Sequence, residues 1–295
     1  MAFGKGVIFM VKPLYKNGNE RAVTLSFDDG TVFDEKIIAI FNTYNLKATF
    51  NLNGGKARNP RFAVEKDGAK LWDGSEELRL LYRGHEIALH SYTHPKINEL
   101  PDDECRFEIE ADKAALEKAF DCKIRGYAAP YGRNDERITE ILRENGICYN
   151  RLVVKNRSLE APADFLHWEP CPHFAFFATE EGKQLINEFF ATEKPLPLLD
   201  VWGHSYELDE EHFERDGRWD ILDCPRFEWF ENFCKTISNR KGVWYATNIE
   251  IYDYITAMRK AKFDDTYIDN PTDETLFFSV NGKTIAAPPH SRFSV

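Results

Sequence analysis

Two short motifs in this sequence combine carboxylates with imidazoles at the ends of apolar segments. The first is Asp28-Asp29-Gly30, which follows the apolar run Val23–Phe27, and the second is His90 with His94, which follows Ile87-Ala88-Leu89. A catalytic zinc-type site uses about three nitrogen or oxygen ligands from the protein and leaves a position open for water. Both histidines and one aspartate would supply such a ligand set. The other aspartate would then stay off the metal and take a proton from water.

Each motif alone has a structural explanation. Asp-Asp-Gly is more often a simple turn, and His-x3-His often belongs to an exposed loop or helix face. Together, at the carboxyl ends of two predicted strands, they favour a site, because that edge carries the sites of α/β folds. Phosphatases with the pattern Asp-x-Asp-Gly-Thr are excluded, since their nucleophilic aspartate would fall on Phe27.

A third candidate lies at the end of a later predicted strand. Asp200, Trp202 and His204 alternate, so they share one face of that strand and suit the floor of a site. The alternative is that Trp202 is core and His204 an interior histidine. His173, in a proline-broken loop, would either line the cleft or cap its loop.

Helical and strand patterns alternate along the chain as far as Lys262. This alternation predicts a parallel sheet with crossover helices, and about seven strands indicate an irregular barrel. Residues 54–73 are predicted to be an inserted loop. Beyond the barrel, Leu276, Phe278 and Val280 alternate before an Asn-Gly turn, which predicts a β-hairpin. We therefore predict a barrel over residues 1–262 and a hairpin appendage, packed on it, over residues 263–295.

Composition narrows the class of protein. The 295 residues carry a formal net charge of −11, which argues against a nucleic-acid substrate and suits a neutral sugar. No apolar run is long enough for a membrane helix, and Val7–Met10 is too short for a signal peptide. Six scattered cysteines without a Cys-x-x-Cys pair indicate free thiols in a reducing compartment. We therefore expect a cytoplasmic protein.

Taken together, the motifs resemble those of the polysaccharide deacetylase family, the carbohydrate esterases of family 4 with a NodB-type domain. That family carries Thr/Ser-Phe-Asp-Asp-Gly, His-Ser/Thr-x-x-His, Arg-x-Pro-Tyr-Gly and a later strand that ends in histidine. The matching segments here are residues 26–30, 90–94, 128–132 and 201–204. The likeness runs in order from about Arg21 to Met258, and it implies an irregular (β/α)7 barrel.

The resemblance also implies roles for the matching residues. Asp28 would be the general base and His204 the general acid, and the backbone N–H of Tyr131 would hold the oxyanion. The implied metal ligands are Asp29, His90 and His94. Zinc is the metal expected from this ligand set, although cobalt, nickel, manganese or iron would also be accepted. The aromatic rings of Trp202, Tyr206 and Trp168 are candidates for stacking on sugar rings, with core packing as the alternative.

Two family positions have no direct match in this chain. The arginine that braces the catalytic aspartate is replaced by Ala128, and Arg125 is the nearest substitute. The aspartate that tunes the acid histidine is missing as well, and Asp164 and Asp200 are both candidates.

The function that follows is a metal-dependent hydrolase that removes acetyl groups from an N-acetylated sugar or oligosaccharide. Two alternatives remain open on the same site. One is hydrolysis of an O-acetyl ester or a cyclic amide. The other is a sugar-binding protein on a deacetylase scaffold that has lost catalysis, which the alanine at position 128 favours slightly.

Overall fold

The computed structural model describes residues 11–56, 74–153, 156–170, 172–211 and 219–295. The apolar patch Val7–Met10, Cys171 and most of the predicted inserted loop lie outside these ranges. The five cysteines within them are free thiols. No helix in the described ranges is both long and apolar enough to cross a bilayer.

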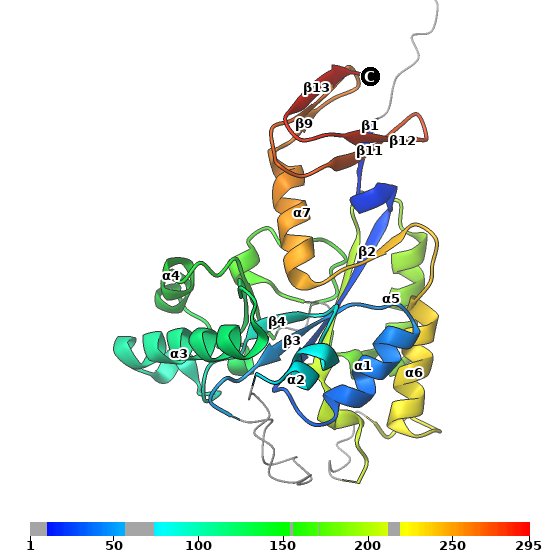
Figure 1. Cartoon of the computed structure of the whole chain (residues 1–295). Helices are drawn as coiled ribbons and strands as arrows, with labels where there is room; N and C mark the ends of the chain where they lie inside the picture. Colours follow the sequence, from blue (N-terminus) through cyan, green and yellow to red (C-terminus); the bar gives the residue numbers. More distant parts are fainter. Residues whose placement is uncertain (1–10, 57–73, 154–155, 171, 212–218) are drawn as a thin grey trace, which may run out of the picture.

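A curled parallel sheet forms the centre of the molecule (Figure 1). Its strands follow the order β6-β5-β4-β3-β2-β7, and β8 also pairs with β2. They are β2 (Arg21–Asp28), β3 (Ala48–Leu52), β4 (Glu86–Leu89), β5 (Gly126–Ala128), β6 (Tyr149–Arg151), β7 (Leu198–His204) and β8 (Val243–Tyr245). The predicted α/β fold with an irregular seven-stranded barrel is confirmed.

The barrel is irregular where β6 and β7 face each other. Trp168 forms an isolated parallel bridge with Arg151 of β6, and His173 forms one with Trp202 of β7. Trp168 thus lies against the β6 edge and His173 against the β7 edge, while β6 and β7 do not pair directly in the part of the chain that the structure describes. Pro170 and Pro172 each lack the N–H that a strand ladder requires, which disfavours a regular strand between these two bridges.

In the part of the chain that the structure describes, seven α-helices pack around this sheet, as the predicted crossover helices require. They are α1 (Asp34–Thr43), α2 (Glu76–Leu81), α3 (Asp102–Phe120), α4 (Glu136–Glu144), α5 (Glu180–Ala191), α6 (Arg226–Ile237) and α7 (Asn248–Lys260) within the described ranges. Two of their starts follow from capping side chains, since Asp135 accepts the N–H of Ile138 and Thr179 that of Gly182. Aromatic rings fill the space beneath α1 and α6, where Phe27 of β2 lies 5.5 Å from Phe41 and 5.8 Å from Phe230 between ring centroids.

The C-terminal residues form more than the predicted hairpin. The hairpin itself is confirmed, as β11 (Leu276–Val280) pairs with β12 (Lys283–Ala287) across Asn281 and Gly282, which both have positive φ. However, β1 (Val11–Leu14) pairs with the other edge of β11, which no sequence pattern indicated. A second small sheet contains β9 (Lys262–Phe263), β10 (Tyr267–Asn270) and β13 (Ser291–Ser294). Figure 1 shows both sheets beyond α7, at the end of the molecule away from α1 and α3.

Candidate active site

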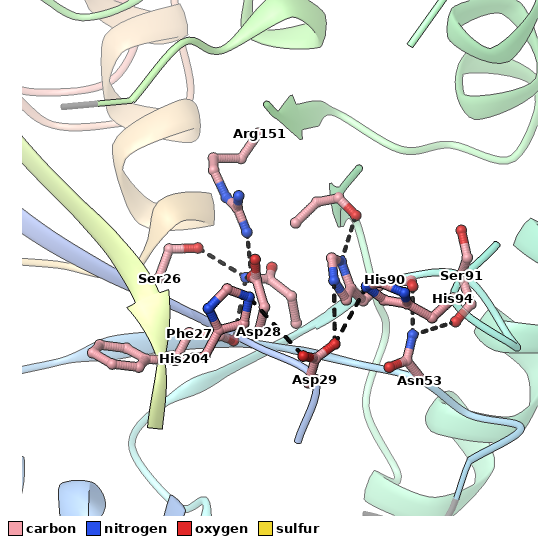
Figure 2. Close-up of polar contacts among 12 residues, drawn as sticks. Ser26, Phe27, Asp28, Asp29, Asn53, His90, Ser91, His94, Arg151 and His204 are labelled. Atoms are coloured by element: carbon pink, nitrogen blue, oxygen red, sulfur yellow. Dashed lines mark hydrogen bonds and ion pairs between the residues drawn. The ribbon is translucent and has the colours of Figure 1, made fainter. Parts of the chain in front are cut away.

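The carboxyl ends of β2 and β4 bring three possible metal ligands together (Figure 2). Asp29 Oδ1 lies 3.6 Å from His90 Nε2 and 3.4 Å from His94 Nε2. The ligand atoms of all three residues lie within 4.8 Å of one another. Burial lowers the pKa of His94 to about 4 and also lowers that of His90, so both imidazoles are neutral and able to bind a metal. Two neutral imidazoles and one carboxylate are a donor set that fits a divalent ion.

A backbone carbonyl orients the first of these histidines. His90 Nδ1 lies 2.8 Å from the carbonyl oxygen of Ala128, at the end of β5. Nδ1 must carry the proton to donate this hydrogen bond, so Nε2 keeps its lone pair and faces Asp29. Such a second contact is what usually fixes the tautomer of a metal-binding histidine.

Asp28 lies beside the three candidate ligands but makes different contacts. Its Oδ1 accepts hydrogen bonds from Arg151 Nη2 and, at 2.8 Å, from Asn51 Nδ2. Burial opposes ionisation of this carboxyl group, but the charge of Arg151 and the neighbouring His90 and His204 outweigh it and lower the pKa of Asp28 to about 2. Asp28 is therefore an ionised carboxylate at neutral pH, as a general base must be.

Arg151 is the brace that sequence reasoning missed. Arg125, the substitute considered above, instead donates hydrogen bonds to Asp253 from Nη2 and Nη1, at 2.6 and 3.0 Å. Arg151 on β6 is the register partner of Ala128 on β5, so the guanidinium reaches Asp28 from the neighbouring strand. The signal available in the sequence was an arginine inside the largely apolar run 147–153, because a charge buried there would require a partner.

His204 stands at the carboxyl end of β7, in register with Asp28 on β2. Its Nε2 lies 4.0 Å from Asp29 Oδ2, and its Nδ1 lies 3.5 Å from Glu207 Oε2. Burial alone would lower the pKa of His204, but Glu207 outweighs it, with help from the two aspartates, and raises the pKa to about 9. The imidazole is therefore protonated at neutral pH, as a general acid must be.

Glu207, not Asp164 or Asp200, is the carboxylate beside His204. Asp164 pairs with His167 at 2.9 Å, and Asp200 accepts a hydrogen bond from the indole N–H of Trp168. Glu207 is buried, and its Oε2 also lies 2.6 Å from His173 Nε2. The imidazoles of His173 and His204 outweigh the effect of burial and hold the pKa of Glu207 well below its usual range. A short turn of 3-10 helix after β7 folds Glu207 back onto His204, which strand spacing could not predict.

Tyr131 combines an unusual backbone with an exposed side chain. Its φ of 56° is positive, the residue is 59% exposed, and its ring centroid lies 4.7 Å from that of His94. Its N–H meets no acceptor among the described residues. An unpaired N–H next to a possible metal ligand can donate to a developing oxyanion.

The two aromatic residues predicted to bind substrate both lie beside His204. The ring centroid of Trp202 lies 5.9 Å from that of His204 and 4.8 Å from that of His173. The ring centroid of Tyr206 lies 5.0 Å from that of His204. Trp168 is buried, and it packs edge-on against Tyr149, which assigns it to the core.

Comparison with known proteins agrees with this geometry. Residues 15–149 match the family model described as polysaccharide deacetylase. A peptidoglycan-N-acetylglucosamine deacetylase from Bacillus cereus is 30% identical over 116 residues, which cover 39% of this chain and 38% of that protein. A chitooligosaccharide deacetylase from Sinorhizobium fredii is 31% identical over 114 residues, covering 38% of this chain and 47% of that protein.

The fold is shared with a solved structure of low sequence identity. A protein from Mycobacterium smegmatis, assigned to the polysaccharide deacetylases, matches with a TM-score of 0.54 and 17% identity over 84% of this chain and 94% of that one. The chain spans less than half the length of the two curated relatives above. The family match also ends at residue 149, before Arg151 and His204, so the positions of these two residues are known from the structure alone.

Proposed function

We propose, for a chain whose residues 15–149 belong to the polysaccharide deacetylase family, that it is a metal-dependent hydrolase of N-acetyl groups on a sugar or oligosaccharide. The proposal rests on Asp28 and His204, two titratable residues that lie beside the three candidate ligands and have opposite pKa shifts. Asp28 has a pKa lowered to about 2, and His204 has one raised to about 9, so a base and an acid are both ready at neutral pH.

The proposed metal ligands are Asp29, His90 and His94. A divalent ion held there, zinc by preference, would supply Lewis-acid chemistry that polarises the acetyl carbonyl and makes water more acidic. Asp28 takes the proton of the attacking water, and Arg151 with Asn51 holds that carboxylate in place. The backbone N–H of Tyr131 donates a hydrogen bond to the oxyanion that forms at the acetyl carbon.

His204 completes the reaction by protonating the leaving nitrogen. An amine leaves poorly without a proton, so a histidine that is charged at neutral pH answers the main difficulty of amide cleavage. Glu207 keeps this imidazole protonated and oriented. Trp202 and Tyr206, whose rings both lie beside His204, are proposed to contact the sugar ring.

The buried Arg151 supports catalysis over mere sugar binding. Ala128 favoured a scaffold that had lost catalysis only because the arginine that braces the base was missing. Arg151 lies on Asp28 and Glu207 lies beside His204, so both proposed proton-transfer residues have a supporting partner and the reason to favour a loss of catalysis is removed.

Moving the arginine from β6 to its register partner on β5 tests the role of Arg151. Arg151→Ala is expected to lower kcat by about 10- to 100-fold, because the base loses its orientation, and to lower the free energy of unfolding by about 3 to 5 kcal/mol, because Asp28 is left buried and unpaired. Adding Ala128→Arg, at the register partner, should recover part of both losses. The matched control is Arg125→Ala, which removes a guanidinium outside the site. Equal losses for Arg125→Ala and Arg151→Ala would show that Arg151 has no special role.

The role of His204 is tested with two leaving groups. His204→Ala should keep its metal and lower the rate on an N-acetylated sugar by about 100- to 10,000-fold. An activated aryl acetate should be hydrolysed at nearly the wild-type rate, because a phenolate leaves without a proton. The rates on both substrates, measured together with the metal content, show whether His204 acts as the general acid. Equal damage to both substrates would remove His204 from proton transfer and leave it a structural or binding role.

A further inference from the structure

The loop that carries the two proposed histidine ligands has an intrinsically unfavourable backbone conformation. Ser91 and His94 both have positive φ, of 62° and 61°, a region that residues other than glycine adopt at a cost in energy. Two such residues within five positions persist only if surrounding contacts hold the loop. The question is which side chains hold it.

The start of the loop is held by side chains from the strand ends and from helix α3. Asn53 Nδ2 donates hydrogen bonds to the carbonyl oxygens of His90 and Ser91, at 2.5 and 2.7 Å (Figure 2). Ser91 Oγ lies 2.8 Å from the hydroxyl of Tyr127 on β5. The N–H of His90 also donates to Asp112 Oδ2 of α3, at 3.0 Å. These contacts hold His90 and Ser91, and none of them reaches Thr93.

The end of the loop is held from helix α3 by one buried carboxylate. Glu108 Oε2 accepts the N–H of Thr93 at 2.8 Å, and Glu108 Oε1 accepts the hydroxyl of Thr93 at 2.6 Å. The carbonyl oxygen of Glu108 also accepts the N–H of Tyr92 at 3.0 Å. Glu108 is 6% exposed, so these contacts are not shared with bulk water. Thr93 immediately precedes His94, so its backbone sets the direction of the His94 side chain.

We propose that Glu108 is a positioning residue, which sets the affinity of the metal site by holding Thr93 and thereby aiming His94. The inference rests on the proposed function, because it requires that His94 is a ligand. Glu108 touches none of the three proposed ligand side chains through its carboxylate, and its effect reaches the site through the backbone. Its role is therefore geometric, so an uncharged side chain that keeps both hydrogen bonds to Thr93 should preserve the metal affinity.

The test is a titration of metal-free protein with Co²⁺, read from visible absorption and from the dissociation constant. Glu108→Ala is expected to bind Co²⁺ about 10- to 100-fold more weakly, the usual cost of losing a partner of a metal ligand. Glu108→Gln should bind within a few fold of wild type. Its amide oxygen can accept the N–H of Thr93 while its NH₂ donates to the Thr93 hydroxyl. Glu110→Ala is the matched control, an exposed carboxylate on the same helix.

Each outcome bears on the proposal. Wild-type affinity and spectrum in Glu108→Ala would overturn it, and so would equal weakening in Glu108→Gln and Glu108→Ala, which would point to charge instead of position. If Glu108→Ala does not fold, as judged by circular dichroism of the metal-free protein, Thr93→Val decides. Thr93→Val should bind about tenfold more weakly, because the charged acceptor loses its hydroxyl donor, and unchanged affinity would overturn the proposal.

Failure of the proposed function would look different. Wild-type protein that binds no Co²⁺ would overturn the metal site itself and this inference with it. Wild-type protein that binds Co²⁺, together with a His94→Ala variant that does not and a Glu108→Ala variant that binds normally, would overturn this inference alone.

Discussion

Asp28→Asn is expected to keep its metal and to lose about 100- to 10,000-fold in kcat, the usual cost of removing a general base. The asparagine can still accept a hydrogen bond from Asn51, so the local contacts change little, but it cannot take a proton from water. Acetate release from an N-acetylated oligosaccharide, measured beside metal content, checks both halves of this result. Some loss of stability is also expected, because Arg151 is left buried without its carboxylate.

The matched control is Asp29→Asn, the same change one residue later. Asp29 is proposed to bind the metal, so this variant should lose metal affinity and turnover together. Asp28 is the last residue of β2 and Asp29 follows it with a positive φ of 76°, so the two adjacent aspartates make different contacts. A metal-free Asp28→Asn protein beside a metal-loaded Asp29→Asn protein would reverse the two assignments.

The positions of the proposed ligand and acid–base residues could be anticipated because most of them lie in short contiguous motifs at the ends of predicted strands. Asp28, Asp29, His90 and His94 follow predicted strands, and a parallel sheet brings the carboxyl ends of its strands to one edge. The structure places all four there, with His204 in register beside Asp28. Helix and strand positions followed from apolar spacing for the same reason, since each element covers one side of a common core.

The supporting residues were missed because their contacts depend on tertiary structure. Arg151 reaches Asp28 across a separation of 123 residues, and its relation to Ala128 appears only in the register of β5 and β6. Glu207 is close to His204 in sequence, but a turn of 3-10 helix directs it back, whereas the strand pattern pointed to Asp200. Glu108 gave no signal beyond a charged residue on the buried face of a helix. Apolar periodicity shows which face of an element is buried. It does not show which polar atoms contact each other in the folded protein.

The appendage illustrates the same limit. The hairpin around Asn281 and Gly282 has a local signature, because both residues of such a turn need positive φ. The pairing of β1 with β11 joins residues near the two ends of the chain, and neither strand carries a local pattern that selects the other.

Loss of the metal is the other large effect that we expect. Without a divalent ion the acetyl carbonyl is not polarised, so chelation should reduce acetate release to background and added zinc should restore it. His94→Ala should have the same effect irreversibly, because two ligands do not retain a metal that needs about three. Metal content measured by mass spectrometry, one equivalent in wild type and none in His94→Ala, checks the assignment. Stoichiometric metal in His94→Ala would contradict it.

The most direct test of the whole account is acetate release from an N-acetylglucosamine oligomer by the loaded, stripped and reloaded protein. We expect turnover in the loaded protein, none after stripping, and recovery on reloading with one equivalent of metal. Full turnover in the stripped protein would contradict the proposed metal site. A loaded protein that holds one equivalent of metal and releases no acetate from N-acetylated sugars would contradict the proposed deacetylase.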